Sequence, residues 1–429
     1  MSRFQLIFIG LIGLLVVFFA LVFLGVIPGL RSGSEKTSAT LSVWGVFDDP
    51  SVFQKLISQY QQTHPNIRVN YRQMNDVSYE QDLVNAAAAG IGPDIFMVHN
   101  TWLPKHYDKM SPFSAESLPI NEFRNLYPSV VEQDFAPDGT VYALPLYLDT
   151  LAMYYNKDIF DSEGIAVPPK TWEEIVTLVP KLRRIDSIGR INRAAVALGG
   201  SNKSINRASD ILAALMLQSG VEMTSKDFTR ATFSNGGDKA LSFYTTFANP
   251  NNQVFTWQEQ LHYSLDNFAA GNTAIMFNYS HQIPLLRSKN PFLNFGVVVF
   301  PQLAQAAKPV AYPNYWGLAV SARSQNKAAA QEFIFALTAS EQLAGTYSDS
   351  TKRPAALRSL IGKKINDPEY GVFASQALIA RSWPQVDNAS ITNIFSEMIE
   401  SVINGRADIF TSINRAQEEV SRLMRLRAK

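Results

Sequence analysis

The sequence of 429 residues contains no cysteine. This absence excludes disulfide bonds, thiolate metal sites, cysteine nucleophiles and a lipid-modified cysteine within the chain. An excess of one charge is also missing, because 38 Lys and Arg side chains offset 37 Asp and Glu side chains to a net charge of +1. Nucleic-acid binding needs a clustered basic surface, so we expect no nucleic-acid partner.

Several signatures of catalysis are absent as well. The chain has no G-x-S-x-G, H-E-x-x-H or P-loop pattern. His99 and His106 stand seven residues apart, which is not a metal-binding spacing. We therefore expect no catalysis, no metal and no cofactor. The alternative is a membrane-anchored glycoside hydrolase, which would need a placed pair of carboxylates such as Asp48 and Asp149.

A long apolar run is present near the N-terminus. Residues 6–30 carry no polar side chain, and a helix of that length would span roughly 37 Å, enough to cross a bilayer. A cleaved signal peptide usually has a shorter apolar core and a small-x-small cleavage site. We interpret residues 1–30 as a retained transmembrane anchor, with a cleaved signal as the alternative. Residues 31–40, rich in Ser, Gly, Thr and charge, predict a flexible linker.

The next part of the chain alternates between strand and helix patterns. The predicted elements are the strand 41–46, the helix 52–61, the strand 67–71, the helix 79–89 and the strand 94–98. This order predicts a parallel sheet with crossover helices. Ligands of such sheets bind beyond the carboxyl ends of the strands. That rule points to Asp48 after the first strand and to Asn100 and Trp102 after the third.

The stretch 138–160 reads DGTVYALPLYLDTLAMYYNKDIF and marks a change of domain. Two apolar runs, 141–148 and 151–155, predict short strands. Pro145 argues against a central strand, because proline cannot donate a ladder hydrogen bond. We interpret this stretch as the crossing from one lobe into another, which places Asp149 at the seam between the lobes. A chain of this length also predicts two domains.

Segments that carry a family resemblance follow one another along the chain. After Trp44 they are YQQTHPNIRVNY, AAAAGIGPDIFMV, YALPLYLDTLAMYYNKDIF with PPKTWEE, FAAGNTAIMFNYS, and PNYWGLAVSARSQNKAAAQEFIFALTASE. From residue 41 to about residue 381, the chain resembles family-one extracellular solute-binding proteins, which serve ABC transporters for sugars and oligosaccharides. The resemblance implies a two-lobe α/β fold of the periplasmic-binding-protein-like type II class, here behind an N-terminal transmembrane helix. It also implies a hinge and a sugar in the cleft between the lobes.

The resemblance also implies domain boundaries and partners. Strand 295–300 is assigned to the first lobe by resemblance, so the chain would cross the hinge near residues 290–291. The resulting division is 1–30 anchor or signal, 31–40 linker, 41–147 and 291–340 first lobe, and 148–290 and 341–429 second lobe. We expect a monomer that binds a carbohydrate outside the cytoplasm, docks on ABC permease subunits and is held at the cell membrane by its N-terminal helix. The alternative is a ligand-sensing receptor subunit without transport.

A sugar site needs flat aromatic rings and a few carboxylate, amide or hydroxyl partners. The candidates at predicted strand ends or loops are Trp44, Asp48, Asn100, Trp102, Asp149, Tyr279, Tyr315, Trp316 and Trp383. The alternative for each aromatic residue is a place in the core. The alternatives for the two aspartates are a helix cap at Asp48 and a turn at Asp149.

Overall fold

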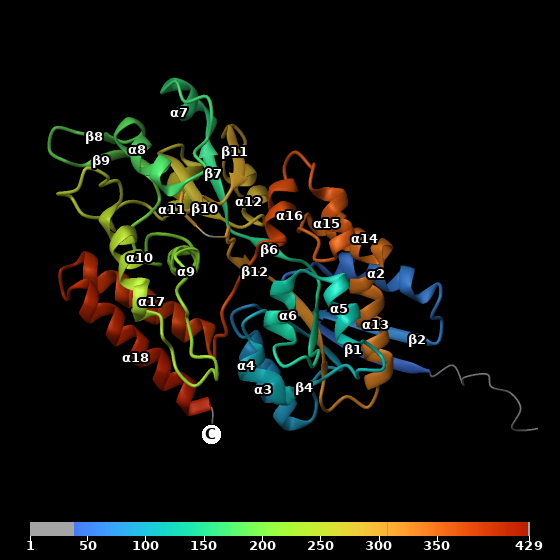
Figure 1. Cartoon of the computed structure of the whole chain (residues 1–429). Helices are drawn as coiled ribbons and strands as arrows, with labels where there is room; N and C mark the ends of the chain where they lie inside the picture. Colours follow the sequence, from blue (N-terminus) through green and yellow to red (C-terminus); the bar gives the residue numbers. More distant parts are fainter. Residues whose placement is uncertain (1–37, 307, 428–429) are drawn as a thin grey trace, which may run out of the picture.

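The computed structural model describes residues 38–306 and 308–427. The predicted anchor at residues 1–30 and most of the predicted linker lie outside this range. Within the described range, no helix is both long enough and apolar enough to cross a bilayer. The described chain forms two α/β lobes that lie side by side, and its blue and orange segments build one lobe while green, yellow and red segments build the other (Figure 1).

Among the described residues, six strands form the sheet of the first lobe in the order β2-β1-β3-β13-β4, with β5 paired to β13. Their bounds are β1 (Ala39–Gly45), β2 (Ile67–Gln73), β3 (Ile95–His99), β4 (Met110–Ser111), β5 (Ala143–Pro145) and β13 (Trp316–Ser321). β1 is parallel to β2 and β3, as predicted, and β13 runs antiparallel to β3. Every residue of β3 is buried, as its continuous apolar run predicts for a strand covered on both faces.

Helices cover both faces of this sheet. They are α2 (Pro50–Gln61), α3 (Tyr79–Ala89), α4 (Leu103–His106), η1 (Tyr107–Lys109), α5 (Ile120–Leu126), α6 (Ser129–Phe135), α13 (Lys327–Ala339), α14 (Glu341–Thr351) and α15 (Arg358–Lys364). The α2 helix begins where the Asp49 carboxylate accepts a hydrogen bond from the Ser51 amide at 2.8 Å. The α3 helix ends at Gly90, whose left-handed φ of 74° suits glycine.

Five strands of the described chain form the second sheet, in the order β11-β7-β10-β9-β8. They are β7 (Ala152–Asn156), β8 (Arg184–Ile185), β9 (Ile191–Val196), β10 (Thr273–Asn278) and β11 (Phe295–Val299). The helices of this lobe are α7 (Lys157–Ser162), α8 (Trp172–Leu182), α9 (Ala208–Gln218), α10 (Ser234–Thr246), α11 (Ser264–Ala269), α12 (Gln282–Lys289), α17 (Asn388–Ile403) and α18 (Ile409–Arg427). Thr171 and Glu174 form the predicted capping box of α8.

The chain passes between the lobes through three segments. β6 (Asp149–Thr150) pairs antiparallel with β12 (Pro313–Asn314), so the first two crossings support each other. Both short strands lie between the lobes in Figure 1. The third crossing follows α16 (Gly371–Ala377), and Ala380 forms a bridge with Ala311 beside it. The prediction that Asp149 lies at the seam is therefore confirmed.

The strand β5 approaches β13 very closely at the first crossing. Pro145 ends β5, and Gly317 lies opposite it on β13. A Cβ atom on Gly317 would lie 2.5 Å from the Leu144 carbonyl oxygen. Glycine is therefore required at this point, because any side chain would force the two strands apart.

Two assignments of segments to lobes were wrong. β11 belongs to the second sheet, because Phe295–Val299 pairs antiparallel with β7, so the chain does not cross near residues 290–291 but at β12. The helices α14 and α15 belong to the first lobe, although residues 341–429 were assigned to the second. Leu343, Tyr347 and Leu360 are part of the first-lobe core, whereas α17 and α18 pack in the second lobe. The apolar faces of α14 and α15 match the core that lies nearest in space, which sequence order did not show.

Candidate functional site

The seam between the lobes carries a group of rings contributed by the first lobe. Trp316 begins β13, and its ring makes edge contacts with Phe47 at 5.4 Å, His99 at 5.3 Å and Trp102 at 5.0 Å between centroids. Tyr79 stacks on Trp102 at 6.0 Å. We call Phe47, Tyr79, His99, Trp102 and Trp316 the ring cluster. The carboxyl ends of β1 and β3 and the start of the antiparallel β13 meet at one edge of the sheet and bring four of these rings together, and the fifth, Tyr79, comes from the start of α3.

Contacts across the seam join the ring cluster to the second lobe. The Trp102 indole N–H donates to the Asn388 side-chain oxygen at 3.1 Å, at the start of α17. Beside it, Lys105 binds Asp387 at 3.0 Å and Glu80 at 2.6 Å. The charge-assisted Lys105–Asp387 contact and the Trp102–Asn388 hydrogen bond join the lobes, whereas Glu80 belongs to the first lobe and holds Lys105 in place.

Asp48 is buried next to the ring cluster but is not a helix cap. Its carboxylate accepts a hydrogen bond from the Tyr347 hydroxyl at 2.9 Å and lies 3.6 Å from the Arg353 guanidinium. Burial raises the pKa of Asp48, while the Arg353 charge and the Tyr347 hydrogen bond oppose the rise. Arg353 in turn lies over the rings of Tyr147 at 4.5 Å and Phe47 at 5.6 Å.

Asn100 and Tyr315 bind an internal carboxylate, that of Asp134. The Asn100 amide donates to Asp134 at 3.0 Å and the Tyr315 hydroxyl at 2.8 Å. The Ser382 hydroxyl, from the third crossing, donates to the other oxygen of the same carboxylate. Burial raises the pKa of Asp134 from 3.8 to about 7, and these three hydrogen bonds oppose the rise. Asp134 thus anchors the crossing segment to the first lobe.

Asp149 lies in β6 at the base of the seam. Its carboxylate accepts hydrogen bonds from the Ser280 amide at 2.9 Å and the Ser280 hydroxyl at 2.7 Å. It also accepts from the Thr150 amide at 2.9 Å, which is the turn-type contact that the sequence left open. His281 lies 3.7 Å away. Asp149 therefore joins β6 to the end of β10.

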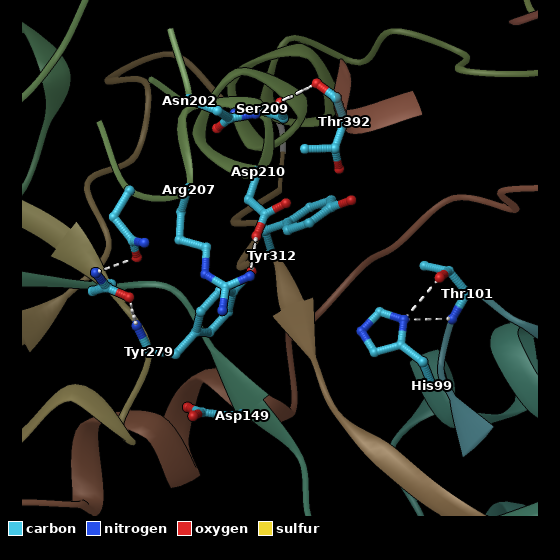
Figure 2. A network of polar contacts seen from close by, with 12 residues as sticks. His99, Thr101, Asp149, Asn202, Arg207, Ser209, Asp210, Tyr279, Tyr312 and Thr392 are labelled. Carbon is cyan, nitrogen blue, oxygen red and sulfur yellow. Dashed lines mark hydrogen bonds and ion pairs between the residues drawn. The ribbon is translucent and has the colours of Figure 1, made fainter. Parts of the chain in front are cut away.

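A charged group from the second lobe faces His99. Arg207, Asp210 and Tyr279 lie at the start of α9 and the end of β10, and Figure 2 shows the Arg207 side chain extending into the region between Asp149 and His99. The Tyr279 hydroxyl donates to Asp210 at 2.9 Å. Burial, and next the Arg207 charge, lower the pKa of His99 to about 3, so this imidazole is neutral. Its Nδ1 lies 2.7 Å from the Thr101 hydroxyl.

A cavity of about 370 Å³ opens beside this region, between Asn100 and Gln133 of the first lobe and Phe228 of the second. Its size lies in the range of small-molecule sites. Pro384 and Val386 of the third crossing line it too, but Trp316, Asp149 and Tyr279 do not. Thr101 lines the cavity and contacts His99, so the two regions adjoin. We place the candidate site at the ring cluster and Arg207, because rings and hydrogen-bonding groups meet there.

The structure does not gather all nine candidates in one place. Trp102, Trp316, Asp149 and Tyr279 surround the seam, and Asn100 and Tyr315 reach it through Asp134. Asp48 is buried, and its carboxylate contacts Tyr347 and Arg353. Trp44 lies on β1 under Arg72, at 5.8 Å, and Trp383 stacks on Phe395 at 6.1 Å as part of the second-lobe core. Trp383 therefore has the core position that was its alternative, and Trp102, Trp316 and Tyr315 likewise pack into the core of the first lobe.

The sequence interpretation did not select several residues that shape the seam. These are His99, Asp134, Arg207, Asp210, Tyr347 and Arg353. Arg207 follows the polar loop 199–202 at the end of a second-lobe strand, so the rule for carboxyl strand ends, applied there, would have indicated it. Nothing local indicated Arg353, which reaches Asp48 across 305 positions of sequence.

No group of three or more His, Asp or Glu side chains in the described range is arranged to hold a metal ion.

Comparisons with known proteins agree with this architecture. A family model described as bacterial extracellular solute-binding protein matches residues 55–370. A Brucella abortus protein is 22% identical over 58% of this chain, and the match spans 59% of that protein's length. The mannitol-binding protein of Pseudomonas aeruginosa is 25% identical over 72% of this chain and 70% of its own. The solved structure of the sugar-binding protein MalE from Xanthomonas citri aligns with 91% of this chain and 98% of its own at 21% identity, with a TM-score of 0.77.

Proposed function

This chain belongs to the bacterial extracellular solute-binding proteins, and on that premise we propose that it is the extracytoplasmic substrate-binding component of an ABC importer. It binds a carbohydrate at the seam and presents the closed lobes to permease subunits. The observation that carries the proposal is the meeting of the ring cluster with Arg207 and Asp149 between two α/β lobes. Rings cover the weakly polar faces of a sugar, and the charged groups bind its hydroxyls.

The relatives support a carbohydrate as the ligand. The Pseudomonas relative carries mannitol in its name, and the Xanthomonas neighbour is named as a sugar-binding protein. We propose that the lobes close by bending at β6 and β12, and the pairing of these two short linking strands between the lobes supports this. Asp48, the other member of the carboxylate pair considered for hydrolysis, is bound to Tyr347 and Arg353. A binding role without turnover is therefore the function we propose.

A thermal-shift screen tests the proposal directly. Residues 38–429 would be mixed with monosaccharides, oligosaccharides and polyols, with amino acids and short peptides as the comparison set. A ligand that binds only the folded state raises the melting temperature by mass action, so we expect at least one neutral carbohydrate to do so and the comparison set to have no effect. A response to peptides alone, or release of reducing ends from the oligosaccharides, would contradict the proposal.

Replacing Trp316 by alanine is expected to weaken the binding of that carbohydrate by about 1–3 kcal/mol, as the loss of a buried ring at a binding site often does. Trp316 is 9% exposed and contacts four other rings at the seam. Calorimetry well below the melting temperature gives the affinity. Trp172→Phe is the matched control, because Trp172 is buried in the second-lobe core. Unchanged affinity in the Trp316 variant would remove this ring from the site.

We propose further that residues 1–30 tether the protein to the membrane in place of the missing cysteine-linked lipid. Cells that make the full chain should retain it in the membrane fraction after a high-salt wash, because a long apolar helix is not released by salt. A control chain with a cleavable signal peptide in place of residues 1–30 should be released. Recovery of a soluble protein that begins after residue 30, from cells that make the full chain, would refute the tether.

A further inference from the structure

Arg207 has a backbone conformation that residues other than glycine rarely adopt. It precedes α9 with φ 69° and ψ 23°, in the left-handed region, and makes no side-chain cap hydrogen bond. Asn and Asp tolerate this region because their short side chains bond locally, whereas arginine gains nothing comparable. Strain of this kind persists where the surrounding structure requires it, most often at functional sites. The position therefore calls for an explanation from what the side chain does.

The Arg207 side chain is held in place, but not all of its hydrogen-bond donors have an acceptor. Its guanidinium lies over the Tyr279 ring at 5.1 Å, and its Nη1 atom lies 3.9 Å from the Asp210 carboxylate. Asp210 is in turn fixed by the Tyr279 hydroxyl. The buried Nε–H of Arg207 has no hydrogen-bond partner among the described residues. A buried donor without an acceptor is costly, and native proteins contain few of them.

Tyr279 cannot serve as the aromatic platform that the sequence predicts. Its side chain is fully buried, with Arg207 over the ring and His281 stacked on it at 6.0 Å. Its hydroxyl is used by Asp210, and its backbone carbonyl accepts a hydrogen bond from Tyr154 at 2.6 Å. The ring therefore supports Arg207, and the guanidinium is the group of this pair that faces the seam (Figure 2).

The charges around Arg207 argue against an acidic ligand. Asp210 lies 3.9 Å from the Arg207 guanidinium. Asp149 is in the same view of Figure 2 with its carboxylate bound to Ser280, and the His99 imidazole is neutral. An incoming anion would have to compete with the Asp210 carboxylate for the guanidinium, and burying unpaired charge is unfavourable. The same groups suit an uncharged ligand, whose hydroxyls donate to carboxylates and accept from the guanidinium. The guanidinium presents donors in a fixed plane, which matches two neighbouring oxygens.

We propose that Arg207, held by Tyr279 and Asp210, is the second-lobe residue that contacts the ligand, and that it selects an uncharged carbohydrate with two neighbouring hydroxyls over an acidic sugar. This inference rests on the proposed function. It assigns Tyr279 the part of a positioning residue and makes Arg207 the determinant of specificity.

Calorimetry on the described chain with three Arg207 variants tests the inference. The probes are D-mannitol, D-glucose and maltotriose as neutral compounds, and D-glucuronate and glucose 6-phosphate as acidic ones. We expect the wild type to bind at least one neutral probe and to bind the acidic probes at least 10-fold more weakly. Arg207→Lys, which keeps the charge but loses the planar donor edge, and Arg207→Gln should each lose at least 10-fold in affinity for the neutral probe.

Arg207→Gly separates binding from folding. Glycine adopts a φ of 69° freely, but on its own it would leave the buried Asp210 carboxylate without its cation. The variant is therefore combined with Asp210→Asn, and this double variant should melt at the wild-type temperature or above it while losing the same affinity. Arg193→Lys is the matched control: Arg193 binds Glu163 and the Leu182 carbonyl away from the seam, and its replacement should leave affinity unchanged. A purely structural Arg207 would instead make this double variant less stable than the wild type while leaving its affinity unchanged, and this outcome would overturn the inference.

Other outcomes are equally distinct. Affinity for the neutral probe within twofold of wild type in the lysine and glutamine variants would overturn the role of Arg207 while leaving the proposed function intact. Tighter binding of glucuronate or glucose 6-phosphate than of the neutral probes would overturn the selection of uncharged ligands. No binding of any probe, together with no response in the wider carbohydrate screen, would overturn the proposed function and this inference with it.

Discussion

Replacing Arg353 by methionine is expected to lower the free energy of unfolding by about 3–5 kcal/mol, the usual cost of breaking a buried ion pair from one side. Asp48 is 3% exposed, and Arg353 is the cation that lies beside it. Methionine would keep much of the apolar contact with Tyr147 and Phe47, so the decrease in the free energy of unfolding would come mainly from the missing charge. Urea denaturation followed by circular dichroism gives the measurement.

The pH dependence of this effect has a defined sign. Without Arg353, the buried Asp48 carboxyl would have a pKa raised further above its unfolded value, because the opposing charge is gone. A carboxyl whose pKa is higher in the folded than in the unfolded state makes the protein less stable as pH rises. The variant should therefore fall further below the wild type in free energy of unfolding at pH 8 than at pH 5.

Tyr347→Phe, which removes one hydrogen bond to Asp48, should lower the free energy of unfolding by about 1–3 kcal/mol.

A double variant checks the physical reason. Asp48→Asn combined with Arg353→Met removes the charge as well as its partner, so it should recover a substantial part of the stability lost in Arg353→Met alone. A cost below 1 kcal/mol for Arg353→Met, or a double variant less stable than the sum of its parts, would contradict the account of an uncompensated buried charge.

Asp134 is expected to make the protein less stable as pH rises from about 4 to about 7. Burial raises the pKa of Asp134 from 3.8 to about 7, so in this window the folded chain keeps a proton that the unfolded chain has released. The free energy of unfolding therefore falls with rising pH, by a few kcal/mol in order of magnitude. Urea denaturation at several pH values between 4 and 8 measures this slope.

Asp134→Asn is the matched variant, because asparagine keeps the size of the side chain and does not titrate. The difference in unfolding free energy between wild type and variant isolates the contribution of Asp134 from those of other groups. We expect this difference to favour the wild type more at pH 4.5 than at pH 7.5. A difference that is flat over this range, or that grows in favour of the wild type with rising pH, would show that Asp134 is ionised in the folded state.

Much of the first lobe could be predicted from local pattern alone. The predicted strand 94–98 and helix 79–89 match β3 and α3 to within a residue, because apolar periodicity, a capping glycine and turn residues agree with one another there. The crossing at Asp149 was visible for the same reason: Pro145 and the polar pair after Leu148 interrupt two apolar runs. The pairing of strands that are far apart in the sequence could not be predicted in this way, and β11 was therefore assigned to the wrong lobe.

At the candidate site too, local pattern predicted the positions of residues but not their partners. The rule for strand ends placed Asn100, Trp102 and Tyr279 near the seam, but it said nothing of which polar atoms already have partners. Asn100 and Tyr315 are bound to Asp134, and Tyr279 lies beneath Arg207. Such pairings depend on residues brought together from distant parts of the chain, for which a single sequence carries no periodic signal.

The sequence by itself determined the α/β lobes, the crossing at Asp149 and the kinship with solute-binding proteins, because these rest on hydrophobic period, turn chemistry and the order of motifs. Only the tertiary structure decided which lobe holds β11, α14 and α15, and that a guanidinium rather than a phenol ring faces the seam. The physical reason is that burial and charge pairing are set by neighbours in space. Arg353 and Asp48, far apart in the chain and 3.6 Å apart in the fold, show this most directly.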